Sequence, residues 1–144
     1  MKQGIQNDFT FNKRILKYGC YFLCLIELGD RLNYDQLKDR LDDPRTLYDT
    51  DHSYQFYVKQ GAMKSDCTIL DPAFILGDIT GKEYRFTRPN EKPDYPYYII
   101  ENIKPGYTHF TLRYKDEIWD PLPPNRAAAK HYTPRSYRLL TPLS

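Results

Sequence analysis

The feature that most constrains the fold is a change of pattern at Gly81. Before it, apolar residues recur at helical spacing, and after it come short segments rich in β-branched and aromatic residues, separated by Pro, Gly, Asn and Asp. Four of these segments predict an antiparallel sheet: residues 84–87, 97–100, 109–114 and 117–120. Helices that precede strands in this way are typical of the α+β class. The length of 144 residues suits a single domain over 1–144, with helices in about 12–80 and the sheet in about 82–141.

The helical half carries several start and stop signals. The run from Phe22 to Leu28 is apolar nearly all round, which predicts a short central helix ended by Gly29. We expect three more helices: one capped by Asn33 with Gln36 and ended by Pro44, one over 47–60 before Gly61, and one from Asp71-Pro72 to Gly77.

The end of the chain is predicted from its turns. Lys115-Asp116 should form a tight hairpin, which would place Asp120 nearly opposite His109 on neighbouring strands. The Pro- and Ala-rich stretch 121–133 is expected to be irregular, and residues 137–140 are expected to add a final edge strand.

Composition narrows the function classes. The 21 Lys and Arg against 19 Asp and Glu leave a formal charge of +2, and the basic residues are scattered, so the sequence does not predict a nucleic-acid partner. Three cysteines are an odd set for a secreted disulfide framework, and the polar residues 1–8 lack the apolar core of a signal peptide. The longest apolar stretch, 21–26, is too short to span a membrane. We therefore expect a cytoplasmic protein with no membrane partner and no cofactor.

Cys20 is the candidate nucleophile because it lies at a helix start, where helix dipole and an adjacent imidazolium would stabilise a thiolate. Its backbone N–H is a natural donor to an oxyanion. Gly19 is read equally well as a site of close approach at the nucleophile or as a simple turn. Cys24, one turn further into the core, is expected to be buried and inert.

His109 and Asp120 are the candidate base and orienting carboxylate. Strand alternation puts His109 and Thr111 on one face, and the hairpin brings Asp120 beside them. Alone, Asp120 before Pro121 would be read as an ordinary Asp-Pro turn. The pairing with His109 favours a catalytic role.

Gly19-Cys20 at the start of an apolar helix, followed by His109-Phe110 and Asp120-Pro121, resembles the layout of papain-fold peptidases that cleave double-glycine leader peptides. The sequence is also similar to an uncharacterised family of spirochaete plasmids and bacteriophages, through Gly19-Cys20-Tyr21-Phe22, Asp66-Cys67 and the same His and Asp motifs. The resemblance implies a papain-like α+β fold, with Cys20, His109 and Asp120 as nucleophile, base and orienter. It also makes a virion or the host cytoplasm an alternative location.

The sequence departs from that layout near the nucleophile. The leader peptidases have a Gln a few residues before the Cys, whereas here Asn12 and Gln6 are the candidates for an oxyanion donor. Loss of such a donor costs about 100- to 1000-fold in rate. Two functions follow: a peptidase- or amidase-like cysteine hydrolase that acts on a peptide or protein through a thioester, and a catalytically inactive phage or plasmid accessory protein that binds a protein partner.

A metal site is the weakest alternative. Cys20 and Cys24 are four residues apart, which does not match structural zinc spacings, so no metal is predicted. Cys67 is expected to pack in the core, with a place in the substrate cleft as the alternative.

Overall fold

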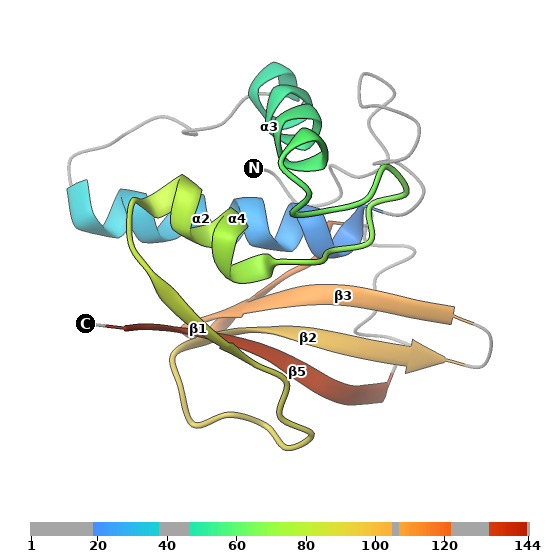
Figure 1. Cartoon of the computed structure of the whole chain (residues 1–144). Helices are drawn as coiled ribbons and strands as arrows, with labels where there is room; N and C mark the ends of the chain where they lie inside the picture. The colour runs from blue at the N-terminus through green and yellow to red at the C-terminus, as the bar shows by residue number, and fades with distance from the viewer. Residues whose placement is uncertain (1–18, 38–46, 105–106, 122–132, 144) are drawn as a thin grey trace.

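The computed structural model describes residues 19–37, 47–104, 107–121 and 133–143. It is an α+β structure in which three helices pack over one antiparallel sheet (Figure 1). The helices are α2 (Cys20–Leu37), α3 (Leu47–Lys59) and α4 (Pro72–Thr80). The strands are β1 (Tyr84–Thr87), β2 (Tyr97–Lys104), β3 (Tyr107–Tyr114), β4 (Glu117–Trp119) and β5 (Thr133–Pro142).

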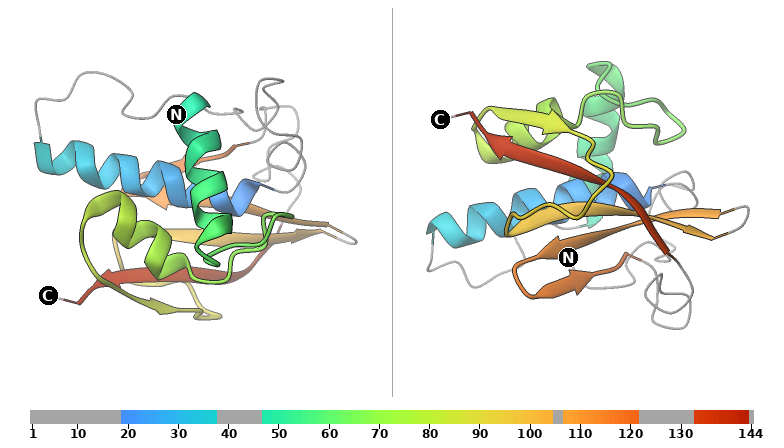
Figure 2. Two further views of the ribbon diagram at one scale, coloured as in Figure 1. Left: turned by 45° about the horizontal axis from the view of Figure 1, so that its top comes forward. Right: turned by 90° about the horizontal axis from the view of Figure 1, so that it is seen from below.

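Helix α2 is the centre of the structure, as the apolar run predicts. Every residue from Phe22 to Asp30 is buried. Helices α2 and α4 lie against the same face of the sheet, and α3 lies beyond them (Figures 1 and 2). The core joins the two layers: Phe22 contacts the rings of Tyr54 and Tyr57 on α3, and Ile99 and Leu112 contribute from the sheet.

Two glycine stops in the helical half are wrong. Helix α2 runs through Gly29, where a side chain would meet Ile79 Cγ2 of α4 at 2.4 Å. Helix α4 likewise continues past Gly77 and ends at Gly81, which has the left-handed φ of 74°. Gly29 therefore makes room for the side chain of Ile79 and Gly77 for the backbone of Lys82, and neither ends a helix.

The prediction that Asn33 caps a second helix is also wrong. It lies inside α2 and caps no new helix; its Nδ2 donates to Ile79 O of α4 at 2.9 Å. The rest of the expected helix, including Pro44, falls in residues 38–46, outside the described residues. The predictions for α3 and for the Asp71-Pro72 start of α4 are confirmed, and the Asp71 side chain accepts a hydrogen bond from Phe74 N.

The sheet has the strand order β1-β5-β2-β3-β4. Strand β5 therefore lies between β1 and β2, and its prediction as an edge strand is wrong. It is also longer than expected, since it begins at Thr133. The β3–β4 hairpin is confirmed, with Leu112 opposite Trp119 and Tyr114 opposite Glu117.

Candidate active site

The site lies where the start of α2 meets strands β3 and β4. Cys20 is the first residue of α2, and Gly19 O accepts the first helical hydrogen bond, from Leu23 N at 2.8 Å. The N–H groups of the first turn, including that of Cys20, therefore have no acceptor within the helix. Cys20 is half-buried, whereas Cys24 is fully buried.

His109 and Asp120 form a buried pair. His109 Nε2 is 2.7 Å from Asp120 Oδ1, and the two residues are 2% and 6% exposed. Continuation of the β3–β4 register puts Asp120 opposite Thr111, so it reaches His109 diagonally on the same face. Because Nε2 contacts Asp120, Nδ1 is the ring nitrogen left to face the thiol.

The pKa of His109 depends on both Asp120 and Cys20. Burial lowers the pKa of His109, but side-chain hydrogen bonds to Asp120 and Cys20 and their negative charges outweigh it, and the pKa rises to about 9. The imidazole is therefore protonated at neutral pH. An imidazolium between a carboxylate and a thiol is the arrangement that stabilises a thiolate.

The two helix cysteines differ as predicted. Burial raises the pKa of the Cys24 thiol well above its usual range, and nearby negative groups, Cys20 and Asp120 among them, add to the effect. Cys24 is therefore neutral and unreactive. A single helical turn separates a half-buried thiol beside an imidazolium from a fully buried one.

Asn102 is a site residue that the sequence predictions miss. It lies opposite His109 in the β2–β3 register, and its Nδ2 donates to His109 O at 3.2 Å and to Thr111 Oγ1 at 3.1 Å. It is 6% exposed, so these bonds fix the backbone that carries His109. The only sequence signal is an amide two residues after Ile100, where the predicted strand ended, in a segment that the structure shows to continue β2.

The remaining predicted residues are placed as follows. Asn12 and Gln6, the oxyanion candidates, lie outside the described residues. Cys67 is both in the core and at a cavity next to the site, and it has a left-handed φ of 70°. The Asp66 carboxylate holds this turn by accepting from Thr68 N at 3.0 Å.

A second group of charges is buried one strand away. Glu101 of β2 accepts from Arg135 Nε at 2.8 Å, Ser136 Oγ at 2.7 Å and Arg138 Nη2 at 3.2 Å. The bond from Arg135, helped by Ser136 and the charge of Arg138, holds the pKa of Glu101 at about 2 against the effect of burial. No sequence motif predicts this cluster, because its residues come from β2 and β5, which are far apart in the chain and pair in the sheet.

A family model described as Protein of unknown function, DUF261, matches residues 1–141. The chain belongs to the DUF261 family. No curated protein and no solved structure matches the sequence. Among the described residues of this DUF261 protein, no helix is both long and apolar enough to cross a bilayer, and no group of three or more His, Cys, Asp or Glu side chains is arranged to hold a metal ion.

Proposed function

We propose that this DUF261 protein is a cysteine hydrolase of the peptidase or amidase type, with a papain-like arrangement of a nucleophile helix on an antiparallel sheet. The observation that carries the proposal is the buried His109–Asp120 pair at 2.7 Å, with the thiol of Cys20 in hydrogen-bond contact with the same imidazole. Nucleophile, base and orienting group in mutual contact are the signature of covalent catalysis.

Each residue has a defined role in the proposed reaction. The Cys20 thiolate attacks the carbonyl carbon of an amide, and the backbone N–H of Cys20 stabilises the oxyanion. The His109 imidazolium then gives its proton to the leaving nitrogen as the C–N bond breaks, which leaves a thioester. His109 next removes a proton from water, whose oxygen attacks the thioester carbonyl, and the carboxylic acid and free thiol are released.

Asp120 is a positioning residue in this scheme. Its carboxylate accepts the Nε2–H of His109 and thereby turns Nδ1 towards Cys20. The raised pKa of His109 suits the acid role, because the ring carries the proton that the leaving group needs at neutral pH.

Alkylation by iodoacetamide, followed by mass spectrometry of each cysteine as a function of pH, tests the proposal. We expect Cys20 to react at pH 6 at least about 10-fold faster than Cys24 or Cys67, because it is half-buried at the start of α2 beside the His109 imidazolium, whereas the other two are buried. His109→Ala should slow Cys20 by about 10-fold or more while the far-UV circular dichroism is unchanged. Cys24→Ala is the matched control and should leave the Cys20 rate unaltered.

The alternative, a non-catalytic phage or plasmid protein that binds a protein partner, predicts the opposite result. Cys20 would then alkylate as an ordinary thiol with a midpoint near pH 8.5, and His109→Ala would not change its rate. That outcome would overturn the proposed hydrolase.

A further inference from the structure

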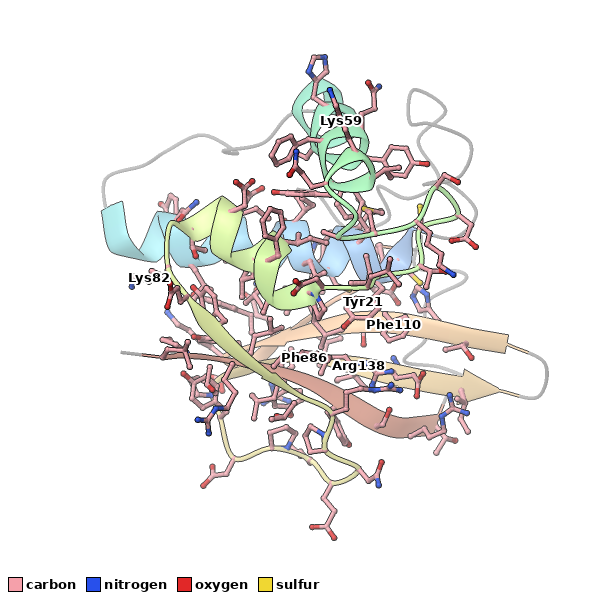
Figure 3. All side chains as sticks on the ribbon, in the orientation of Figure 1. Tyr21, Lys59, Lys82, Phe86, Phe110 and Arg138 are labelled. Carbon is pink, nitrogen blue, oxygen red and sulfur yellow. The ribbon has the colours of Figure 1, made fainter. Side chains whose placement is uncertain are left out.

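A cavity of about 380 Å³ opens beside the proposed active site. Tyr21 and Phe110 line it, and each directly follows a reacting residue, Cys20 or His109, in the chain. Consecutive Cα atoms are about 3.8 Å apart, so the backbones of Cys20 and His109 adjoin the residues that line the cavity. Figure 3 shows Tyr21, Phe110, Phe86 and Arg138 gathered between the start of α2 and the sheet. A volume of this size, roughly 300 to 1000 Å³, is typical of binding pockets.

One wall of the cavity is rigid and aromatic. The rings of Tyr21 and Phe110 stack with centroids 4.5 Å apart. The guanidinium of Arg138 lies 5.9 Å from the Tyr21 ring and 5.4 Å from the Phe110 ring. Arg138 is 4% exposed and is ion-paired with Glu101, so it is fixed in position and holds the rings in place.

Arg88 supplies an exposed positive charge at the cavity. It follows β1, lines the cavity and is exposed. Its positive charge acts on Tyr21 and on Arg138, and no carboxylate in the described part of the chain forms an ion pair with it. The lining residues include two arginines and no Asp or Glu.

We propose that this cavity binds the side-chain carboxylate of an acidic residue next to the scissile bond of the substrate. The inference rests on the proposed function, because it assigns a substrate class to the same site. Arg88 would donate charge-assisted hydrogen bonds to the carboxylate, and the methylene groups of the side chain would pack on Phe86 and Tyr21. A single exposed guanidinium above apolar walls suits one carboxylate on an aliphatic stem.

Binding to the full chain carrying Cys20→Ala tests the site without turnover. The probes are three N-acetylated dipeptide amides, Glu-Gly, Gln-Gly and Lys-Gly, titrated into ¹⁵N-labelled protein and followed by NMR. We expect the Glu peptide to bind about 5- to 10-fold more tightly than the Gln peptide, with shifts at Tyr21, Arg88 and Phe110. Equal affinities, or shifts confined to residues outside the cavity, would overturn the inference.

Matched variants make the charge argument specific. Arg88→Gln should remove the preference for Glu over Gln, and Arg88→Glu should favour the Lys peptide. Arg85→Gln, a change at an exposed arginine on β1 outside the cavity, should leave the preference intact. A preference that survives Arg88→Gln, or disappears in Arg85→Gln, would refute the assignment.

The two proposals fail in different ways. Iodoacetamide carries no side chain for the cavity, so its rate at Cys20 reports on the hydrolase alone. Slow alkylation with Arg88-dependent Glu binding would refute the hydrolase and retain a carboxylate site. Fast alkylation with equal binding of the Glu and Gln peptides would refute the carboxylate site and retain the hydrolase.

Discussion

The sheet carries two clusters in which a buried carboxylate is paired with a cation, and the two clusters differ in the last group that they contact. In the first, Glu101 accepts three hydrogen bonds and both of its oxygens are bound by cations or a hydroxyl from β5. In the second, one side of the His109 ring contacts Asp120 and the other contacts the half-buried thiol of Cys20. The partners of Glu101 are all hydrogen-bonded side chains of β5, whereas the second cluster ends on Cys20, the proposed nucleophile. A buried charged group whose partners are all hydrogen-bonded stabilises the fold, whereas one that contacts a half-buried thiol can also take part in the proposed reaction.

The largest effect on stability should come from removing the carboxylate of Glu101. Glu101→Gln leaves Arg138 buried without its counter-charge, so the free energy of unfolding should fall by about 3 to 5 kcal/mol, measured by urea denaturation. The variant is expected to lose stability without losing selective alkylation of Cys20 in the fraction that remains folded.

Arg135→Gln is the matched control for this change. Its side chain is 55% exposed, so the same carboxylate loses a partner that water can replace. The free energy of unfolding should change by only a small fraction of the Glu101 effect. Equal losses in the two variants would show that burial of Arg138 does not distinguish them.

The next effect is a pH dependence that belongs to the His109–Asp120 pair. The pKa of His109 is raised from an ordinary 6.5 to about 9, so the pair stabilises the folded state fully below about pH 6.5 and loses this contribution as the pH rises towards 9. The free energy of unfolding should therefore fall by at most about 3 kcal/mol over that window.

Asp120→Asn should flatten this profile, because the carboxylate that favours the imidazolium is gone. The variant should be less stable than the parent at pH 6 and similar to it at pH 9.5, in urea titrations at both values. The Glu101→Gln variant should keep the slope of the parent. A slope that persists in Asp120→Asn would assign it to another group.

The smallest effect concerns the backbone behind His109. Asn102→Ala removes the donor to His109 O and Thr111 Oγ1 and should cost about 1 to 2 kcal/mol. Because His109 would then be less well placed, the pH at which Cys20 alkylation is half-maximal should move upward, which a purely structural residue would not cause. Asn33→Ala, which removes the hydrogen bond that the Asn33 side chain of α2 donates to Ile79 O of α4, should cost a similar amount and leave that pH unchanged.

Local signals in the sequence account for much of the fold. The Asp71 cap, the Gly61 and Lys115-Asp116 turns and the apolar run after Gly19 depend on neighbours in the chain, and the structure confirms the elements that they predict. The pairing of His109 with Asp120 is predictable for the same reason, because a tight hairpin fixes which residues of two strands meet. The failures at Gly29 and Asn33 share one cause, since each residue is explained by a contact of α2 with α4, whereas Gly77 lies against Lys82 O just beyond its own helix.

The sequence by itself determined the order of helices and strands, the central buried helix with Cys20 at its start, and the hairpin that joins His109 to Asp120, since all of these follow from periodicity and turn chemistry within short segments. Only the tertiary structure decided that β5 inserts between β1 and β2, and with it the Glu101–Arg138 cluster and the cavity that holds Arg88. Strand order depends on how distant segments pair and bury their faces together. Such pairing leaves no mark in the local pattern of either segment.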